Sequence, residues 1–360
     1  MKLQDLNPLR CDPRIQFKRE TVLGGRDVII VSYMIADSDL WEQENALEAR
    51  GITFDAVSGD CIARPFEKFF NVGEREETQP HRLDFEGARV FEKRDGSMIT
   101  PVLINWCVEF KTKKSFTSDV ALSASACAPE LLKEFCLHCL SQRITPIFEF
   151  THPQHTVVIE YGDEPKFVLL AARRMDSGEY VELSELMPER WGIECIEEYS
   201  LTVDEVFAQM KERTEFEGYV LLLRDGRRVK IKTEWYLRNH RLRTELRVKD
   251  VALAVVDETL DDVKSALALE GFDLSPVEEI ERQVVREIAQ IETSVKYLAD
   301  LIRREPTRKD AALKYRQDEN FGAAVTLVYG NADSVDYAAL WKKRYLKDVS
   351  LSVLYRNRKV

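Results

Sequence analysis

The chain has 360 residues, of which 44% are hydrophobic and 32% charged, and its formal net charge is −11. This is the composition of a globular protein with a large core, and the length suggests two to three domains. The longest apolar stretch, residues 28–36, is far too short to span a membrane, and the N-terminus has no apolar signal region. We therefore expect a cytoplasmic protein without a membrane partner, and the negative charge argues against nonspecific coating of nucleic acid.

The strand-like part of the chain runs from about residue 15 to about residue 240. Short runs of β-branched and aromatic residues alternate there with turn residues, and helical patterns interrupt them at about 119–141 and 203–213. We predict an α+β domain with mostly antiparallel sheets. The predicted strands lie at residues 28–31, 52–54, 89–92, 102–104, 147–150, 156–159, 167–170, 219–223 and 229–231.

After about residue 243 the strand pattern nearly disappears, and apolar residues recur at helical spacing. Ser275-Pro276-Val277-Glu278 is typical of a helix start, with Ser as the cap, Pro in the first turn and Glu three residues after the cap. This change of periodicity predicts two domains, residues 1–242 and an all-helical domain of residues 243–360.

The seven cysteines are odd in number and scattered along the chain, which is not the pattern of a disulfide framework. Cys136-Leu137-His138-Cys139 contains residue types that bind metals, but no second pair stands at zinc-ligand spacing. We expect free thiols and a core position for this segment.

Two cations in the N-terminal part of the chain, Arg50 and Lys68, are candidate phosphate contacts. Arg50 follows a Glu-Ala pair, and Lys68 and Phe70 lie in the segment Arg64–Asn71. Arginine can bind phosphate oxygens with two parallel hydrogen bonds, and an aromatic ring can pack on a purine. No glycine-rich loop of the P-loop or dinucleotide-binding type is present to explain these residues.

Lys93 is the candidate nucleophile. It ends an apolar run and is followed by Arg94-Asp95-Gly96-Ser97, which contains an Asp-Gly turn. A lysine held beside a tight turn and crowded by other cations can be kept uncharged and therefore nucleophilic. By itself the segment is weak evidence, because Asp-Gly is also a common hairpin turn and a lysine beside it is usually a solvated surface residue.

Phe148-Glu149-Phe150 places a carboxylate between two aromatic residues on a predicted strand. If the rings face the core, Glu149 faces the opposite side, where it could accept hydrogen bonds from a ribose. The alternative is an ordinary outward-facing glutamate.

Glu217–Lys232 is predicted to form a strand, an Asp-Gly turn and a second strand. Strand alternation places Val229 and Ile231 on one face and Lys230 and Lys232 on the other, about 6 to 7 Å apart. Two lysines at this spacing suit a polyphosphate, although lysines on an edge strand also protect a sheet from aggregation.

These segments together resemble a known family. In chain order they are similar to the nucleotidyl motifs of covalent nucleotidyltransferases, and the upstream segments narrow the resemblance to ATP-dependent RNA ligases of the bacteriophage RNA ligase 1 type. The resemblance covers about residues 15–240, and the helical segment that follows agrees in place and size. The segments that carry it are Glu48–Gly51, Arg64–Asn71, Lys93–Ser97, Phe148–Phe150, Phe167–Arg173, Glu217–Val220 and Val229–Lys232.

The resemblance implies a strand-joining reaction in three steps. Lys93 would attack the α-phosphate of ATP to form lysyl-AMP, AMP would pass to an RNA 5′-phosphate, and a 3′-hydroxyl would displace AMP. The implied cofactors are ATP and Mg²⁺ or Mn²⁺, and the implied partner is RNA with these two ends, broken tRNA among them, in a role in RNA repair. For the helical domain the family suggests docking of structured RNA, and no obligate protein partner is evident.

The resemblance also implies roles by position. Lys230 and Lys232 would join Lys93 as catalytic residues that contact phosphate, and Glu217 would help to place the metal ion. Within Lys111-Thr112-Lys113, we favour Lys113 as a phosphate contact. The ATP-binding set implied in this way is Arg50, Lys68, Phe70, Asp95, Gly96, Lys113, Glu149 and Glu217.

Two other classes of protein fit parts of this pattern. DNA ligases and mRNA-capping guanylyltransferases share the lysine chemistry, but a β-barrel normally follows their last motif, whereas helical periodicity follows it here. The other alternative is a catalytically silent RNA-binding protein that has kept the fold. The complete set of lysines and glutamates argues against it.

Overall fold

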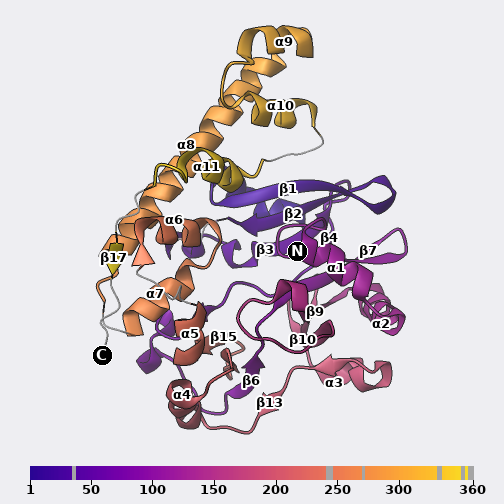
Figure 1. Ribbon diagram of the computed structural model, residues 1–360. Coiled ribbons are helices and arrows are strands. Elements are labelled where there is room, and N and C mark those ends of the chain that lie inside the picture. The colour runs from indigo at the N-terminus through magenta and orange to yellow at the C-terminus, as the bar shows by residue number, and fades with distance from the viewer. Residues whose placement is uncertain (35–37, 241–245, 270–271, 331–334, 350–352, 356–360) are drawn as a thin grey trace.

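The computed structural model describes residues 1–34, 38–240, 246–269, 272–330, 335–349 and 353–355 (Figure 1). Three mainly antiparallel sheets make up the first two thirds of the chain, and helices make up the rest. The predicted α+β class, with antiparallel sheets followed by helices, is confirmed. No helix among the described residues is both long and apolar enough to cross a membrane.

The first sheet is a meander of four antiparallel strands in chain order. Gly24 and Gly25 close its first hairpin at positive φ, where glycine is favoured. One face packs on apolar side chains of the N-terminal segment, including Leu6, Leu9 and Trp41. Its elements are η1 (Leu3–Cys11), β1 (Ile15–Val22), η2 (Leu23–Gly25), β2 (Arg26–Tyr33), η3 (Ser38–Glu42), η4 (Ala46–Glu48), β3 (Arg50–Asp55) and β4 (Cys61–Ala63).

The second sheet has the order β11-β10-β9-β7-β8, and β12 pairs in parallel with β10. Two helices, α1 and α2, pack on the face that carries Phe110 and Phe148, and Phe135 of α2 is buried against it. Cys136 and Cys139 are buried in this core, and all seven cysteines are free. The elements are β7 (Ser97–Ile104), β8 (Cys107–Lys111), α1 (Asp119–Cys127), α2 (Glu130–Ser141), β9 (Ile144–Thr151), η7 (Pro153–His155), β10 (Lys166–Arg174), β11 (Tyr180–Val181), α3 (Leu183–Leu186), η8 (Pro188–Trp191) and β12 (Glu194–Cys195).

The third sheet has the order β13-β6-β14-β15-β5, and all its pairings are antiparallel except β15 with β5. Val206 and Met210 of a covering helix pack against buried residues of β14 and β15. Strand β6 belongs to this sheet and β7 to the second, so the chain passes between the two sheets directly after Lys93. The elements are β5 (Phe70–Asn71), η5 (Glu76–Thr78), η6 (Pro80–Arg82), β6 (Arg89–Lys93), β13 (Glu198–Tyr199), α4 (Val203–Glu212), β14 (Gly218–Leu222) and β15 (Arg228–Lys232).

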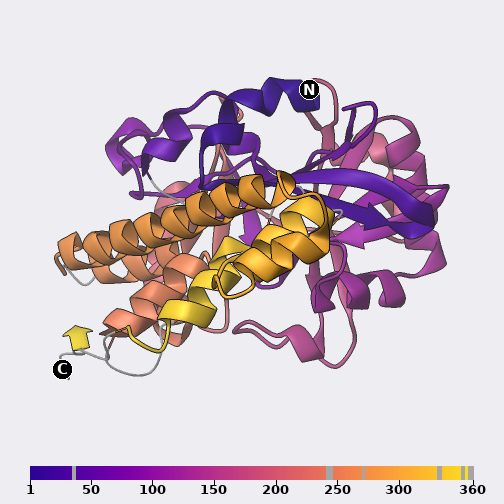
Figure 2. The same cartoon turned by 90° about the horizontal axis from the view of Figure 1, so that it is seen from above.

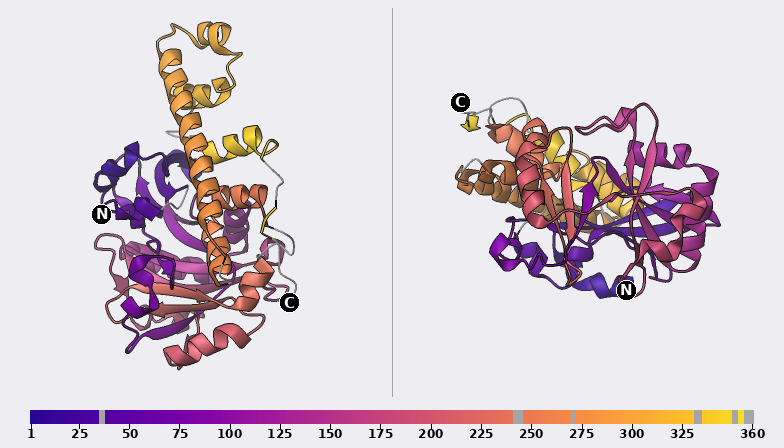
Figure 3. Two further views of the ribbon diagram at one scale, coloured as in Figure 1. Left: turned by 90° about the vertical axis from the view of Figure 1, so that its left-hand side faces the viewer. Right: turned by 90° about the horizontal axis from the view of Figure 1, so that it is seen from below.

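The helical region has a hydrophobic core of its own, formed by residues of α6 to α11 together with Met34. Helix α8 runs alongside the sheets and continues past them, and α9 and α10 pack at its far end (Figures 2 and 3). The proposed boundary between residues 242 and 243 stays a prediction. The elements are α5 (Glu234–His240), β16 (Leu246–Arg247), α6 (Val248–Val256), α7 (Leu260–Leu269), α8 (Ser275–Arg303), α9 (Arg308–Tyr315), α10 (Phe321–Tyr329), α11 (Tyr337–Tyr345) and β17 (Val353–Tyr355).

Two local expectations are wrong. Residues 156–159 do not form a strand, because the N–H groups of Val158 and Ile159 bind a carboxylate instead of a neighbouring strand. The helical pattern at about 119–141 is confirmed as α1 and α2, which are separated at Pro129, a residue without the N–H that would continue the first helix. Helix α8 does begin at Ser275, but the hydroxyl of Ser275 donates to Asp273 rather than capping the helix.

Candidate active site

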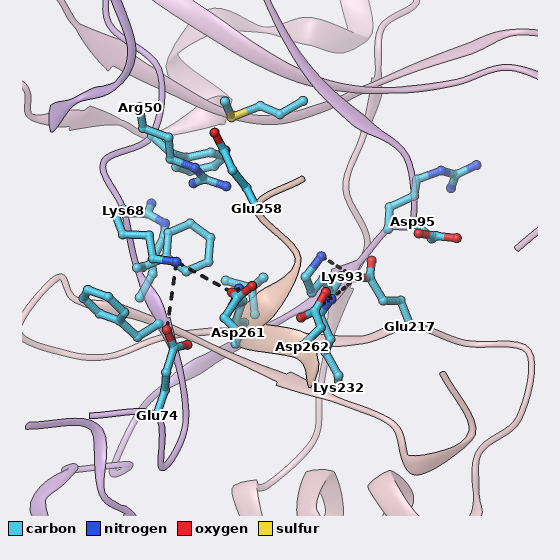
Figure 4. Close-up of a pocket in the computed structure, with 18 of the residues that line it drawn as sticks. Arg50, Lys68, Glu74, Lys93, Asp95, Glu217, Lys232, Glu258, Asp261 and Asp262 are labelled. Atoms are coloured by element: carbon cyan, nitrogen blue, oxygen red, sulfur yellow. Dashed lines mark hydrogen bonds and ion pairs between the residues drawn. The ribbon is translucent and has the colours of Figure 1, made fainter. Parts of the chain in front are cut away.

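A cavity of about 470 Å³ opens where the second and third sheets approach the turn between α6 and α7. Among the described residues, every side chain predicted for the site lines this cavity except Lys113. Figure 4 shows that the charged groups converge from several elements. The predicted residues that line it are Arg50, Lys68, Phe70, Lys93, Asp95, Gly96, Glu149, Glu217, Lys230 and Lys232.

Lys93, Glu217 and Lys232 form the centre of the site. Gly218 pairs with Lys93 on one side and with Lys232 on the other, so the two lysines flank the strand that follows Glu217. Both amines contact the same oxygen, Oε1 of Glu217, Lys93 at 2.7 Å and Lys232 at 3.0 Å. A Cβ at Gly218 would lie 2.0 Å from the carbonyl oxygen of Ile231, so only glycine allows this packing.

The charge around Lys93 differs from the expected ring of cations. Its amine is paired with Glu217, a carboxylate that is 2% exposed. Burial raises the pKa of Glu217, but Lys93 and Lys232 outweigh burial and hold the pKa below its usual value. We expected other cations to crowd Lys93, but its direct partner is the carboxylate of Glu217, which also contacts Lys232.

A second cluster surrounds Asp261, which lies 2.9 Å from Lys230 and 3.6 Å from Lys68. Lys68 is buried, with its ammonium 5.2 Å from the ring centre of Phe70 and 5.7 Å from that of Trp41. Burial lowers the pKa of Lys68, but the neighbouring carboxylates raise it above its ordinary value. In this structure Phe70 lies beside the ammonium of Lys68, and its expected contact with a purine stays a prediction.

Lys230 and Lys232 lie on the cavity face of β15, while Val229 and Ile231 are buried on the other face. The alternation predicted from the sequence is thus confirmed. Lys232 also contacts Asp262 at 2.9 Å, so each of the two lysines meets a carboxylate of α7.

Lys113 lies behind the cavity wall. Its ammonium pairs with Glu258 and lies 3.7 Å from the ring centre of Tyr33. Burial and neighbouring cations lower its pKa well below the ordinary value. The preceding Lys111 is also buried, and it donates to the carbonyl oxygen of Gly51 at 2.6 Å. Burial lowers the pKa of Lys111 to about 7.

Glu149 projects into the cavity from β9, opposite to the buried rings of Phe148 and Phe150, as predicted. Burial raises the pKa of Glu149 to about 8, although Lys93 opposes this shift. Gly96 allows the chain to pass close to β9, since a Cβ there would lie 2.7 Å from the carbonyl oxygen of Phe150. A protonated Glu149 can donate as well as accept a hydrogen bond.

The sequence did not reveal the acidic turn, defined here as residues 258–262, which ends the connection from α6 and forms the first turn of α7. Glu258, which has φ of +62°, pairs with Lys113 and Lys114, while Asp261 and Asp262 meet the lysines of β15. Two aspartates in the first turn of a helix are common, because they interact favourably with the helix dipole. The sequence around them therefore does not indicate that they pair with distant lysines. This acidic turn brings the helical region into the site (Figure 4).

The site has carboxylates that could hold a divalent cation together with a bound polyphosphate. Oε2 of Glu217 is buried and has no hydrogen-bond partner among the described residues. No group of three or more His, Cys, Asp or Glu side chains among the described residues could hold a metal ion by itself. Mg²⁺ usually binds through one or two carboxylates, water and phosphate oxygens, and Glu217 offers one such carboxylate oxygen.

The site brings Lys93, a buried carboxylate and several further cations together in one cavity, an arrangement that suits a phosphate-containing ligand. Residues 48–236 match the family model described as RNA ligase, of the type named for phage T4 RNA ligase 1. This match spans more than half of the chain. The chain therefore belongs to the RNA ligase family.

Two relatives and one solved structure show the range of the similarity. A Thermovibrio ammonificans protein named as a candidate RNA ligase is 32% identical over 228 residues, 61% of this chain and 60% of that protein. RNA ligase 1 of bacteriophage TS2126 is 28% identical over 258 residues, 68% of this chain and 64% of that protein. The chain thus spans less than two thirds of each relative. An archaeal ATP-dependent RNA ligase structure has a TM-score of 0.45 and 12% identity over 78% of this chain and 77% of that chain.

Proposed function

We propose that this protein is an ATP-dependent RNA ligase, which joins RNA 5′-phosphate and 3′-hydroxyl ends through lysyl-AMP and RNA-adenylate. The observation that carries the proposal is the pairing of Lys93 and Lys232 with one oxygen of Glu217, inside a cavity lined by further cations. Membership of the RNA ligase family supports a strand-joining reaction over other reactions in which a lysine is the nucleophile.

In the first step Nζ of Lys93 would form a bond to the α-phosphorus of ATP, and the bond to the pyrophosphate oxygen would break. The amine must lose a proton before it attacks, and Glu217 at 2.7 Å fixes its direction. Negative charge then grows on the leaving pyrophosphate. Lys68, Lys230 and Lys232 can stabilise that charge because they line the cavity and their side chains are largely buried.

The opposite part of the cavity suits the nucleoside. Apolar side chains from the two facing sheets line it, among them Met98, Leu170 and Val220, and a flat base can lie between such surfaces. Glu149 can exchange hydrogen bonds with a ribose hydroxyl, in line with its proposed role as a nucleoside contact. Glu217 and Asp262 would hold Mg²⁺ when ATP brings it, and the ion would neutralise charge on phosphate oxygens.

Transfer of label from ATP to the protein tests this proposal. The wild-type protein, incubated with α-labelled ATP and Mg²⁺, should yield a labelled band that withstands denaturing electrophoresis, and Lys93→Ala should yield none. The matched control is Lys166→Ala, which removes an exposed lysine of β10. Label retained by Lys93→Ala would remove this residue from its role, and labelling by GTP instead of ATP would favour capping chemistry.

The substrate class is tested with the same preparation. A ligase for RNA should seal a single-stranded RNA with a 5′-phosphate at least about tenfold faster than the matching DNA or a nicked duplex. Equal or faster sealing of nicked DNA would favour the DNA ligase alternative. Tight RNA binding without any adduct would favour the silent RNA-binding alternative.

A further inference from the structure

The segment between β9 and β10 is bound to the turn that follows Lys93. The phenol oxygen of Tyr161 accepts a hydrogen bond from the backbone N–H of Asp95 at 3.0 Å. In return, Oδ2 of Asp95 accepts from the N–H groups of Val158 and Ile159 at 2.8 and 2.7 Å. Backbone and side chain of one residue thus hold the segment at two places.

The other oxygen of Asp95 is also occupied within the protein, because the hydroxyl of Tyr236 in α5 donates to Oδ1 at 2.8 Å. Asp95 lies to the side of the cluster of lysines and carboxylates in Figure 4. Its carboxylate therefore holds neighbouring segments together.

Arg94 completes this arrangement. Its guanidinium lies 4.2 Å from the ring centre of Tyr161, and its side chain is 9% exposed. The nearest carboxylates, Glu92 and Glu194, are 3.8 Å from it, beyond hydrogen-bond distance. The ring of Tyr161 is thus a main packing surface for the residue next to Lys93.

This support matters because the chain leaves the third sheet at Lys93 and enters the second sheet at Ser97. Residues 94–96 make no strand pairing in either sheet, so side chains must fix their conformation. Among the described residues, Arg94 and Asp95 line the main cavity, and Tyr161 lies behind them. It acts through Arg94 and Asp95.

We propose that Tyr161 is a positioning residue for Lys93, which holds the turn after the nucleophile so that the amine meets the α-phosphate in line. The inference rests on the proposed ligase function. The proposal predicts different effects on the three steps of the reaction. Lys93 forms a bond in the first step and loses it in the second, whereas the third step joins two RNA ends without a covalent bond to Lys93.

Tyr161→Phe is a sharp test, because it removes only the acceptor oxygen and keeps the ring under Arg94. We expect the single-turnover rate of adenylylation at saturating ATP to fall by about tenfold or more. This is the change in rate that corresponds to the free energy of one lost hydrogen bond. The dissociation constant of ATP should stay within about twofold, since no nucleotide contact is removed. Sealing of a preformed RNA-adenylate should stay within about threefold.

The matched control is Tyr199→Phe, which removes a phenol that donates to Glu197 at 3.0 Å on the third sheet outside the cavity. It should leave all three measurements unchanged. Adenylylation of Tyr161→Phe at the wild-type rate would overturn the inference, as would an equal loss in adenylylation, ATP binding and sealing of RNA-adenylate together with a lower melting temperature. Absence of adenylylation in the wild type would instead overturn the proposed function.

Discussion

At the scale of single residues, the site depends on how buried carboxylates are paired. Glu217 is shared by two lysines and keeps a lowered pKa, whereas Glu149 is buried without such pairing and has a raised pKa. The same residue type therefore has two charge states at neutral pH in one cavity. This difference suits Glu217 to hold amines and a cation, and suits Glu149 to hydrogen-bond a neutral sugar.

The pH dependence of stability should reveal Glu149. Its folded pKa of about 8 lies above the ordinary value of 4.5, so its contribution to stability is complete below pH 4.5 and is lost as the pH rises through 8. Glu149→Gln has no proton to lose. Its free energy of unfolding in urea should match the wild type at pH 5 and exceed it at pH 9, by on the order of a few kcal/mol. Glu164→Gln, at an exposed position, is the control. Parallel pH curves for Glu149→Gln and wild type would contradict the raised pKa.

At the scale of elements, strand β15 and the acidic turn of residues 258–262 meet in the cavity. The lysines of β15 each meet an aspartate at 2.9 Å. Burial raises the pKa of Asp261, but Lys230 and the other lysines lower it far below its ordinary value, so the carboxylate is charged. A polyphosphate must therefore share these lysines with the acidic turn or replace it.

Neutralising the acidic turn should strengthen the binding of a metal-free polyphosphate. In Asp261→Asn/Asp262→Asn, two negative charges beside the lysines are lost, so inorganic tripolyphosphate should bind several-fold to about tenfold more tightly without divalent cations. Titration calorimetry at low salt measures this, and added salt should reduce the difference. Asp257→Asn is the control, because Asp257 pairs with Lys342 outside the cavity. Weaker binding by the double variant would show that the carboxylates do not compete with phosphate.

At the scale of the whole molecule, the helical region contributes to the site at one end and extends far from it at the other. The acidic turn lies in the cavity, while α9 and α10 lie at the far end of α8 (Figures 1 and 3). At that end Arg308 lies 5.8 Å from the ring centre of Tyr329, which is 43% exposed. We propose that this end docks structured RNA, including broken tRNA, because a cation beside an exposed ring suits both phosphate contact and base stacking.

Loss of this pair should affect long, structured substrates only. Arg308→Ala/Tyr329→Ala should seal a nicked tRNA about threefold to tenfold more slowly at subsaturating RNA, since one phosphate contact and one stacking surface are lost. Adenylylation and sealing of a short single-stranded RNA should not change, because neither residue lines the cavity. Arg282→Ala, at an exposed position of α8 paired with Glu279, is the control. An equal loss on both RNA substrates would contradict docking at this end.

The sequence alone predicted the central strands of the three sheets and the faces of β9 and β15. The strands it found are β2, β3, β6, β7, β9, β10, β14 and β15, whereas it did not predict β1, β4, β5, β8, β11, β12 or β13. The predicted strands and faces depend on alternation and on Asp-Gly turns, which act over a few residues, so Lys230, Lys232 and Glu149 could be assigned to one side of their strands. It also identified the helical character of the last third of the chain. The predicted strand at residues 156–159 was wrong because a distant carboxylate, Asp95, bound its backbone groups.

Only the tertiary structure decided which charges meet. The pairing of Lys93 with Glu217 depends on the register of β6 and β14, more than a hundred residues apart, and the pairing of Lys230 with Asp261 depends on how a helix packs against the sheets. The same is true of Lys113, whose burial beside Glu258 removed it from the cavity wall. Local patterns constrain the direction of a side chain, whereas burial and ion pairing follow from contacts that form when distant segments pack together.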